Sequence, residues 1–185
     1  MDYKEKLKKF NSTEKYQQEL DMMYYLLNPK LGEKILDYGC GTGYAMRYFE
    51  SRLNPVYYHG YDVDETLFDL EDKTKLKTKI WFELDKYYFL HSLAHIPNIQ
   101  EVLKEQVYTH SKGEVSVITP NRLWIEKQDS KNYVPDPTVF KHYSQKELIA
   151  LFEFCGYDII MCGQFGNLFD GQNERIFLKA IKNDQ

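Results

Sequence analysis

The chain has 185 residues, 43% of them hydrophobic and 16% aromatic, a composition typical of one soluble globular domain with a single core. Its net charge of −4 provides no general attraction for nucleic acid, and no apolar run reaches the roughly 18 residues that a membrane span needs. The charged first thirty residues and three cysteines without a CxxC pair favour a cytoplasmic protein. We therefore expect a single domain over residues 1–185 without membrane association.

The first half of the chain predicts a helix and then a strand, a glycine turn, a helix and a second strand. Apolar residues of the first helix recur every three or four positions, at Tyr16, Leu20, Met23, Tyr24 and Leu27. We expect residues 1–30 to form an N-terminal helical cap. The apolar residues Ile35 and Leu36 before Asp37 in KILDY (34–38) predict a buried strand of a parallel sheet. A helix is predicted over 44–53, and a turn and strand over 54–64.

The second half alternates in the same way and ends in a hairpin. Strands are predicted over 85–92 and 112–120, and helices over 97–110 and 144–156. In the last helix Ser144 and Glu147 have the spacing of a capping box, and Gly156 stands where a helix ends. Two further apolar runs, 157–162 and 175–182, predict an antiparallel hairpin. This order indicates a three-layer α/β fold whose sheet is mostly parallel.

The glycine turn after the first strand reads Asp37-x-Gly39-x-Gly41-x-Gly43. The dinucleotide fingerprint requires a glycine where this chain has Tyr44, and a phosphate-binding P-loop requires a lysine that is absent here. A second acid, Asp62, ends the next strand. At the crevice above adjacent parallel strands, such an acid can accept both hydroxyls of a ribose.

Five blocks of sequence resemble class I S-adenosylmethionine-dependent methyltransferases of the small-molecule branch (methyltransferase type 11-like). They are ILDYGCGTGYAMRYF, HGYDVDE, LDKYYFLHSLAHIPNIQEVLKE, GEVSVITPN and HYSQKELIALFEFCGYDII, in that order along the chain. The resemblance implies a Rossmann-like methyltransferase sheet, S-adenosylmethionine as cofactor, and methyl transfer to an oxygen, nitrogen or carbon nucleophile of a small molecule. Methylation of a protein or nucleic acid, and a non-catalytic binding or scaffold protein, are the alternatives. Oligomeric state is not predicted.

The resemblance also implies roles for the residues around the glycine turn. The backbone at Gly39, Cys40 and Gly41 would approach the amino-acid end of the cofactor, because a side chain would fill that space. Asp37 would hold the cofactor's ammonium. Asp62 would hold the ribose and Val63 would lie against the adenine. The plainer interpretations are a helix-capping Asp37 and a solvated loop acid at Asp62.

The segment after Asp62 departs from the family pattern. Only 22 residues, 63–84, separate this acid from Asp85, in the block LDKYYFLHSLAHIPNIQEVLKE that resembles the family's fourth strand. We therefore expect a sheet reduced around its third strand, with a strand at most at KIWF (79–82). The adenine pocket is then trimmed, or rebuilt from residues such as Trp81, Phe82 and Glu83.

His91 lies at the end of the family's fourth strand, where the resemblance implies a place near the cofactor's transferred methyl group. It is the candidate for positioning or deprotonating a substrate, and the alternative is a hydrogen-bonded wall residue. His95 would share a face with His91 if the chain is helical there. A zinc site is not expected, since no third ligand is evident.

Residues 120–143 form a long, aromatic-rich connection, which predicts a lid or substrate loop. Candidate substrate contacts in this segment are Trp124, Tyr133, His142 and Tyr143. The alternative is that these aromatic side chains pack the loop onto the sheet.

Overall fold

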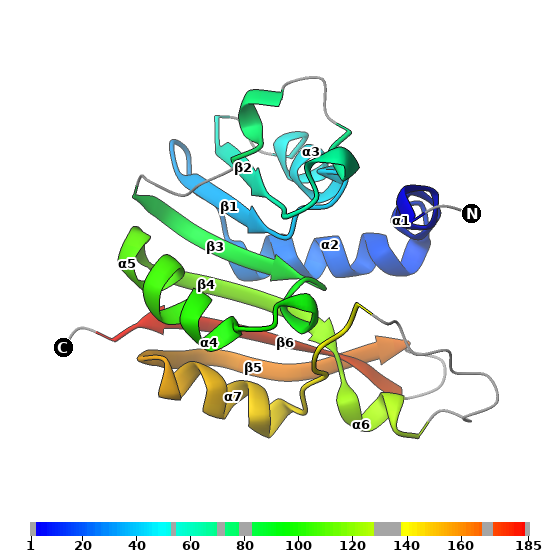
Figure 1. Ribbon diagram of the computed structural model, residues 1–185, viewed down its shortest axis with the longest axis vertical. Helices are drawn as coiled ribbons and strands as arrows, with labels where there is room; N and C mark the ends of the chain where they lie inside the picture. The colour runs from blue at the N-terminus through cyan, green and yellow to red at the C-terminus, as the bar shows by residue number, and fades with distance from the viewer. Residues whose placement is uncertain are drawn as a thin grey trace.

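One mixed six-stranded sheet organises the computed structural model, which describes residues 3–52, 55–69, 73–77, 83–127, 138–167 and 172–183 (Figure 1). The strands lie in the order β2-β1-β3-β4-β6-β5. Their bounds are β1 Lys34–Tyr38, β2 Tyr57–Tyr61, β3 Leu84–Leu90, β4 Ser111–Pro120, β5 Tyr157–Asn167 and β6 Gln172–Lys182. The first four strands are parallel, and β6 pairs antiparallel with both β4 and β5. The predicted mostly parallel sheet with a C-terminal antiparallel hairpin is confirmed.

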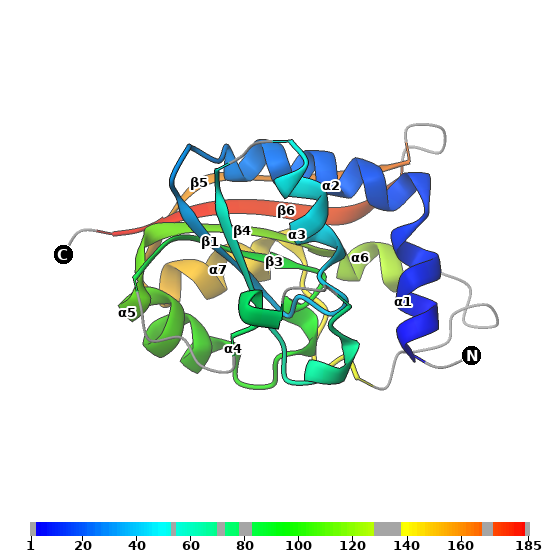
Figure 2. The same cartoon turned by 90° about the horizontal axis from the view of Figure 1, so that it is seen from above.

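Helices cover both faces of this sheet, which gives three layers (Figure 2). One face carries α2 (Glu14–Leu27) and α3 (Tyr44–Glu50). The other carries α7 (Gln145–Phe154) and a continuous helical segment over residues 99–110. That segment comprises α4 (Ile99–Glu101), a π-helical stretch (Val102–Val107) and α5 (Tyr108–His110). Two short helices, α1 (Tyr3–Asn11) and α6 (Arg122–Ile125), lie beyond the carboxyl ends of the parallel strands (Figure 1).

Polar side chains cap the amino ends of α7, as predicted, and of α2. Ser144 and Glu147 form the capping box of α7, in which each side chain bonds the other residue's backbone amide. Thr13 caps α2 by accepting a hydrogen bond from the amide of Tyr16. Gly156, at which the sequence predicts α7 to end, follows this helix and has a left-handed φ of 87°.

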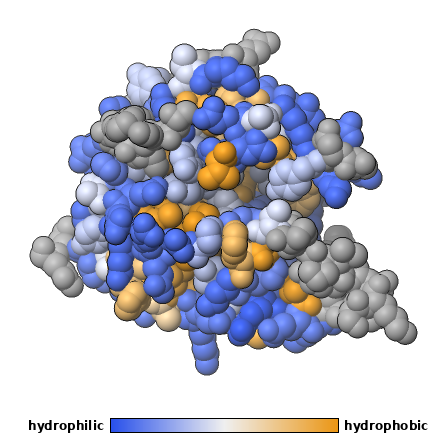
Figure 3. Space-filling view, in the orientation of Figure 1, coloured by the Kyte–Doolittle hydropathy of each residue, from blue (hydrophilic) through white to orange (hydrophobic). Residues whose placement is uncertain are grey.

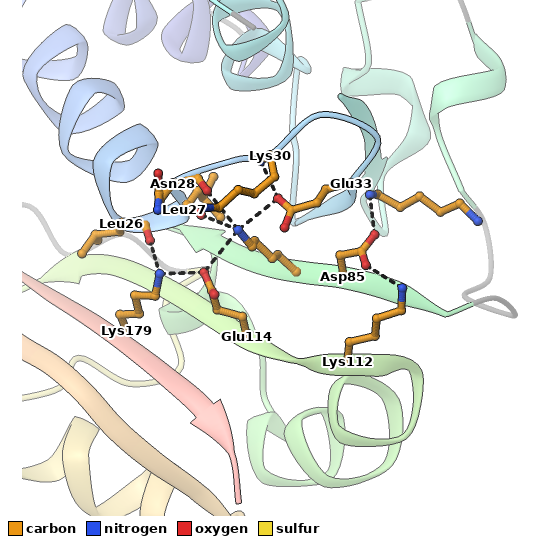
Figure 4. Close-up of polar contacts among 11 residues, drawn as sticks. Leu26, Leu27, Asn28, Lys30, Glu33, Asp85, Lys112, Glu114 and Lys179 are labelled. Carbon is orange, nitrogen blue, oxygen red and sulfur yellow. Dashed lines mark hydrogen bonds and ion pairs between the residues drawn. The ribbon is translucent and has the colours of Figure 1, made fainter. Parts of the chain in front are cut away.

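The carboxyl end of α2 is fixed to the sheet by lysine side chains (Figure 4). Lys179 donates to the carbonyl of Leu26 at 2.8 Å, and the buried Lys86 donates to the carbonyls of Leu27 and Asn28 at 2.8 and 3.1 Å. The last carbonyls of a helix have no partner within the helix and carry partial negative charge, so cations stabilise them. This anchor fixes the axis of α2, whose other end reaches the carboxyl edge of the sheet.

The third-strand region is reduced in the part of the chain that the structure describes. Leu76 forms a single parallel bridge with Gly60 on the outer edge of β2, and the amide of Lys77 donates to the Gly60 carbonyl at 2.7 Å. The predicted strand at 79–82 lies outside the described residues, as do Trp81 and Phe82. Glu83 is exposed and precedes β3, at the edge of the sheet opposite the glycine turn. The suggestion that Glu83 lines the adenine pocket was therefore wrong.

The surface is largely hydrophilic in the view of Figure 3, with apolar residues in separate small groups. Among the described residues, no helix is both long and apolar enough to cross a membrane.

Candidate active site

The glycine turn between β1 and α3 is tied to the end of β2. The amides of Gly39 and Cys40 donate to the carbonyl of Tyr61 at 2.7 and 3.0 Å, and the amide of Gly41 donates to Oδ2 of Asp62 at 2.8 Å. A phosphate-binding turn presents such amides to its ligand. Here the three amides donate to acceptors within the protein. This agrees with the sequence analysis, in which the glycine spacing did not match a phosphate-binding loop.

Gly39 and Gly60 are required by close packing inside the site. Gly39 has a φ of 83°, and a Cβ there would lie 2.3 Å from Cβ of Ser92, which follows β3. At Gly60 a Cβ would lie 2.6 Å from Sγ of Cys40. The side chain of Cys40 therefore points into the core, where burial raises the pKa of its thiol. Cys40 can present only its backbone to a ligand.

Asp37 is a buried carboxyl at the carboxyl end of β1. Its side chain is 2% exposed, and its Oδ1 atom has no hydrogen-bond partner. Burial raises the pKa of Asp37 to about 8, the nearby Tyr88 hydroxyl partly opposes that shift, and the charge of Asp62 adds to it. The amino end of α3 is capped by Gly43 without any side-chain hydrogen bond, so Asp37 is not a helix cap. A desolvated carboxyl with an unused oxygen fits a cationic ligand group such as an ammonium.

Asp62 follows β2 and is not simply a solvated loop acid. Oδ2 accepts from Gly41, and Oδ1 accepts from the amide of Asp64 at 3.0 Å. Each carboxylate oxygen has two lone pairs, so both oxygens retain one for a further donor such as a ribose hydroxyl. Val63 is 89% exposed, which leaves its side chain free to contact a ligand.

The helix α1 lies over the glycine turn. Cδ1 of Leu7 is 3.6 Å from the position that a Cβ would take at Gly41, and Asn11 donates to the Thr42 hydroxyl at 3.1 Å. Lys4 and Lys8 also form ion pairs with Asp69, at 2.9 and 2.6 Å. Residues of the N-terminal segment thus cover the turn.

His91 follows β3 with a φ of 65°, which is uncommon for a residue other than glycine. Its amide donates to the carbonyl of Ile118, and its Nε2 lies 2.6 Å from Oε2 of Glu19 on α2. The rings of Phe10 and Tyr16 lie against the imidazole, with centroids 5.7 and 6.2 Å away. His91 is therefore held by groups from both N-terminal helices.

Glu19 in turn contacts Arg175 of β6, whose Nε donates to Oε1 at 2.6 Å. Burial opposes ionisation of Glu19, but the charges and hydrogen bonds of His91 and Arg175 outweigh burial and lower its pKa to about 2. The sequence analysis missed both Glu19 and Arg175. The one available signal was an acid on the apolar face of α2, three residues after Tyr16 and next to Leu20.

Comparisons with known proteins agree with this geometry. A family model described as a methyltransferase domain matches residues 9–161. The chain belongs to the methyltransferase domain family. This confirms the class I S-adenosylmethionine-dependent methyltransferase resemblance and S-adenosylmethionine as cofactor. A search of curated proteins gave no match.

Solved structures share the methyltransferase fold at low sequence identity. An S-adenosylmethionine-dependent methyltransferase from Archaeoglobus fulgidus is 15% identical, with a TM-score of 0.75 over 98% of this chain and 100% of that one. One from Aquifex aeolicus is 16% identical, with a TM-score of 0.71 over 98% and 99%. Magnesium protoporphyrin IX methyltransferase from Synechocystis PCC 6803, solved with bound S-adenosylhomocysteine, is 15% identical, with a TM-score of 0.70 over 91% and 84%. Identities this low establish the shared fold alone.

The second histidine of the methyltransferase has different partners from His91. His95 lies in a 3-10 turn over Leu93–His95, and its Nδ1 is 2.8 Å from the hydroxyl of Thr138. Since His91 pairs with Glu19 instead, the two histidines do not act as a pair. Within the described residues, no three metal-ligating side chains gather in one place.

The segment 120–143, predicted to be a lid or substrate loop, is described at both of its ends. Asn121 and Tyr143 form a parallel bridge at its base, and Trp124 on α6 has the ammonium of Lys15 5.8 Å from its ring centroid. Tyr143 is 4% exposed and packs in the core beside a groove of about 780 Å³ between α4 and α7. His142 is half-buried, and Tyr133 lies outside the described residues. Trp124 is the substrate candidate that lies near α2, through Lys15, whereas Tyr143 packs as a core residue.

Proposed function

We propose that this methyltransferase transfers a methyl group to a nucleophile of a small molecule by in-line displacement. The observation that carries the proposal is the cover over the glycine turn, in which Leu7 packs on Gly41 and Asn11 bonds Thr42. A covered site favours an acceptor small enough to be enclosed, whereas a protein or nucleic acid chain needs an open groove. The net charge of −4 also favours a small acceptor over nucleic acid.

Residues of the glycine turn and the two acids would hold the methyl donor. Asp37 would take the ammonium of the amino-acid end, and Asp62 the ribose hydroxyls, next to the backbone of Gly39, Cys40 and Gly41. Val63 would contact the adenine. S-adenosylmethionine supplies, when bound, a methyl group on a positively charged sulfur that is already an activated leaving group. The two acids and the faces of Phe10 and Tyr16 offer an environment that favours positive charge.

The protein contributes alignment and exclusion of water more than chemical activation. A proton transfer is required only when the nucleophilic atom of the acceptor carries a proton. His91 lies at the carboxyl end of β3 beside the rings of Phe10 and Tyr16, and we assign it the role of positioning or deprotonating that acceptor. Trp124 and His142 would border the acceptor from the lid.

Titration calorimetry with S-adenosylmethionine tests the cofactor half of this proposal. We expect Asp62→Ala to weaken binding by about 1–3 kcal/mol, because an ionic hydrogen-bonding group is lost. Asp64→Ala is the matched control, since Asp64 is exposed and caps only the 3-10 turn at Glu65–Leu67. Equal affinities of the two variants would remove Asp62 from the site.

Transfer of a radiolabelled methyl group tests the acceptor half. The acceptor panel contains phenols, carboxylic acids and primary amines, compared with bulk transfer RNA and an unfolded protein. The proposal expects product in the small-molecule fractions only. Labelled RNA or protein without any labelled small molecule would contradict it.

A further inference from the structure

The carboxylate of Glu19 lies between an imidazole and a guanidinium. Oε2 is 2.6 Å from Nε2 of His91, and Oε1 is 2.6 Å from Nε of Arg175. The Glu19 side chain is 1% exposed and that of Arg175 is 10% exposed. The three residues come from α2, the end of β3 and β6, so the arrangement exists only in the folded chain.

Such a buried cluster is weak support for stability alone. Removing charges from water costs several kcal/mol per ion, and apolar residues of similar volume often replace buried ion pairs without loss. One member of the cluster, His91, also has an uncommon backbone conformation and lies at the carboxyl edge of the sheet. These features together indicate that the carboxylate orients the imidazole.

Hydrogen-bond chemistry then fixes the proton on His91. An ionised carboxylate only accepts, so Nε2 must carry the proton that points to Oε2. In the neutral ring Nδ1 is consequently an acceptor. No partner is found for Nδ1 among the described residues, and this atom is not buried, so it is free to accept a proton from a ligand.

We propose that Glu19 is a positioning residue that holds His91 with Nδ1 ready to accept a proton, and that Arg175 fixes the orientation and charge of Glu19. This inference rests on the proposed function, and it narrows the acceptors to hydroxyl and amine compounds. The O–H or N–H proton moves to Nδ1 as the heteroatom's electron pair bonds the methyl carbon. The electron pair of the broken carbon–sulfur bond stays on sulfur, and His91 releases the proton to water afterwards.

The tautomer of His91 is the decisive observable. Nitrogen-15 NMR of the histidine-labelled full chain, at a pH where imidazoles are neutral, distinguishes a protonated from an unprotonated ring nitrogen. His91→Gln assigns the signals, because the protein has five histidines. We expect the Nε2–H tautomer in the natural protein. The Nδ1–H tautomer, or the mixture typical of a free imidazole, would overturn the proposal.

For the variant Glu19→Gln we expect the opposite tautomer of His91. Arg175 has only donors and takes the amide oxygen of the new side chain, so the amide NH₂ faces His91 and Nε2 must accept. The proton therefore moves to Nδ1. Glu14→Gln, an exposed site in the first turn of the same helix, keeps the natural tautomer. Retention of Nε2–H in Glu19→Gln would contradict the proposal.

A second variant covers the case in which Glu19→Gln does not fold. Glu19→Gln combined with Arg175→Met removes both buried charges, and the amide loses its fixed orientation, so we expect both tautomers of His91. A pure Nε2–H tautomer there would show that Glu19 does not position the ring. Calorimetry with S-adenosylmethionine separates the two proposals, because donor binding rests on Asp37 and Asp62 and not on the tautomer.

Discussion

Gly39 lies directly against Ser92, so that a Cβ on Gly39 would be 2.3 Å from Cβ of Ser92. Ser92 also donates from its hydroxyl to the carbonyl of Tyr38. The turn after β1 and the segment after β3 are thereby joined at the carboxyl edge of the sheet. The glycine is needed for packing within the protein as well as for any approach of a ligand.

Gly39→Ala should therefore be far more destabilising than the same change at Gly32. Both glycines have a positive φ, 83° and 84°, so both pay about 1–2 kcal/mol of backbone strain. Gly32 has no atom within 4 Å of the added Cβ, whereas Gly39 meets Ser92 and loses about 1–3 kcal/mol more through overpacking. Urea unfolding measures both variants. Ser92→Gly in the Gly39→Ala background should recover the packing part, and equal losses at the two glycines would disprove the contact.

The buried carboxyl of Asp37 should make stability fall as pH rises. Its pKa is about 8 in the folded chain against an ordinary 3.8, so the folded state keeps a proton that the unfolded state releases. The stabilisation is complete below about pH 4 and is lost as pH rises through 8, with a slope of at most about 1.4 kcal/mol per pH unit. Asp37→Asn lacks this proton exchange. Without donor, we expect the variant to gain stability relative to the natural protein between pH 5 and 8, by urea unfolding at both values.

The same substitution should weaken donor binding, since an amide cannot neutralise an ammonium. The expected loss is about 1–3 kcal/mol in calorimetry. A variant that gains stability and keeps its affinity would show that Asp37 is buried for another reason. A stability difference independent of pH would show that the carboxyl is ionised in the folded chain.

The strands and the glycine turn were predictable because their signals are local. The apolar run before Asp37 and the capping box at Ser144 depend on neighbouring residues alone, and both are found as expected. Asp37 itself was assigned from its place before the turn. The sequence alone does not reveal that this carboxyl has an unpartnered oxygen.

The surroundings of His91 were not predictable, because they join distant segments. Glu19 and Arg175 are 156 residues apart, and neither belongs to a recognisable motif. Glu83 was named for the adenine pocket because it belongs to the segment after Asp62, but it directly precedes β3 and therefore lies at the amino end of that strand. Direction along a strand decides which edge of the sheet a residue reaches.

Ion pairs to Asp69 should hold α1 over the glycine turn. Lys4 and Lys8 both contact this carboxylate, and the pair of hydrogen bonds lowers the pKa of Asp69 to about 2. We expect Lys8→Gln to speed hydrogen exchange of the α1 amides about two- to five-fold, the range set by an exposed ion pair. Lys9→Gln, on the same helix and in no described ion pair, is the control. The difference between the two variants should vanish near 1 M salt, where screening acts within about 3 Å.

Lys86 on β3 and Lys112 on β4 give a last pair of variants to compare, one buried and one exposed. Lys86 is 5% exposed, bonds the carbonyls of Leu27 and Asn28, and lies 3.0 Å from Glu33. Lys86→Met leaves the buried carbonyl of Leu27 without this donor and removes the cation beside Glu33, so we expect a loss of about 1–3 kcal/mol in urea unfolding. Lys112→Met breaks an ion pair with Asp85 whose lysine is 57% exposed, and it should leave the unfolding midpoint nearly unchanged. If the two variants unfold alike, the bonds of Lys86 to the end of α2 do not stabilise the fold, and the position of α2 depends on its other contacts.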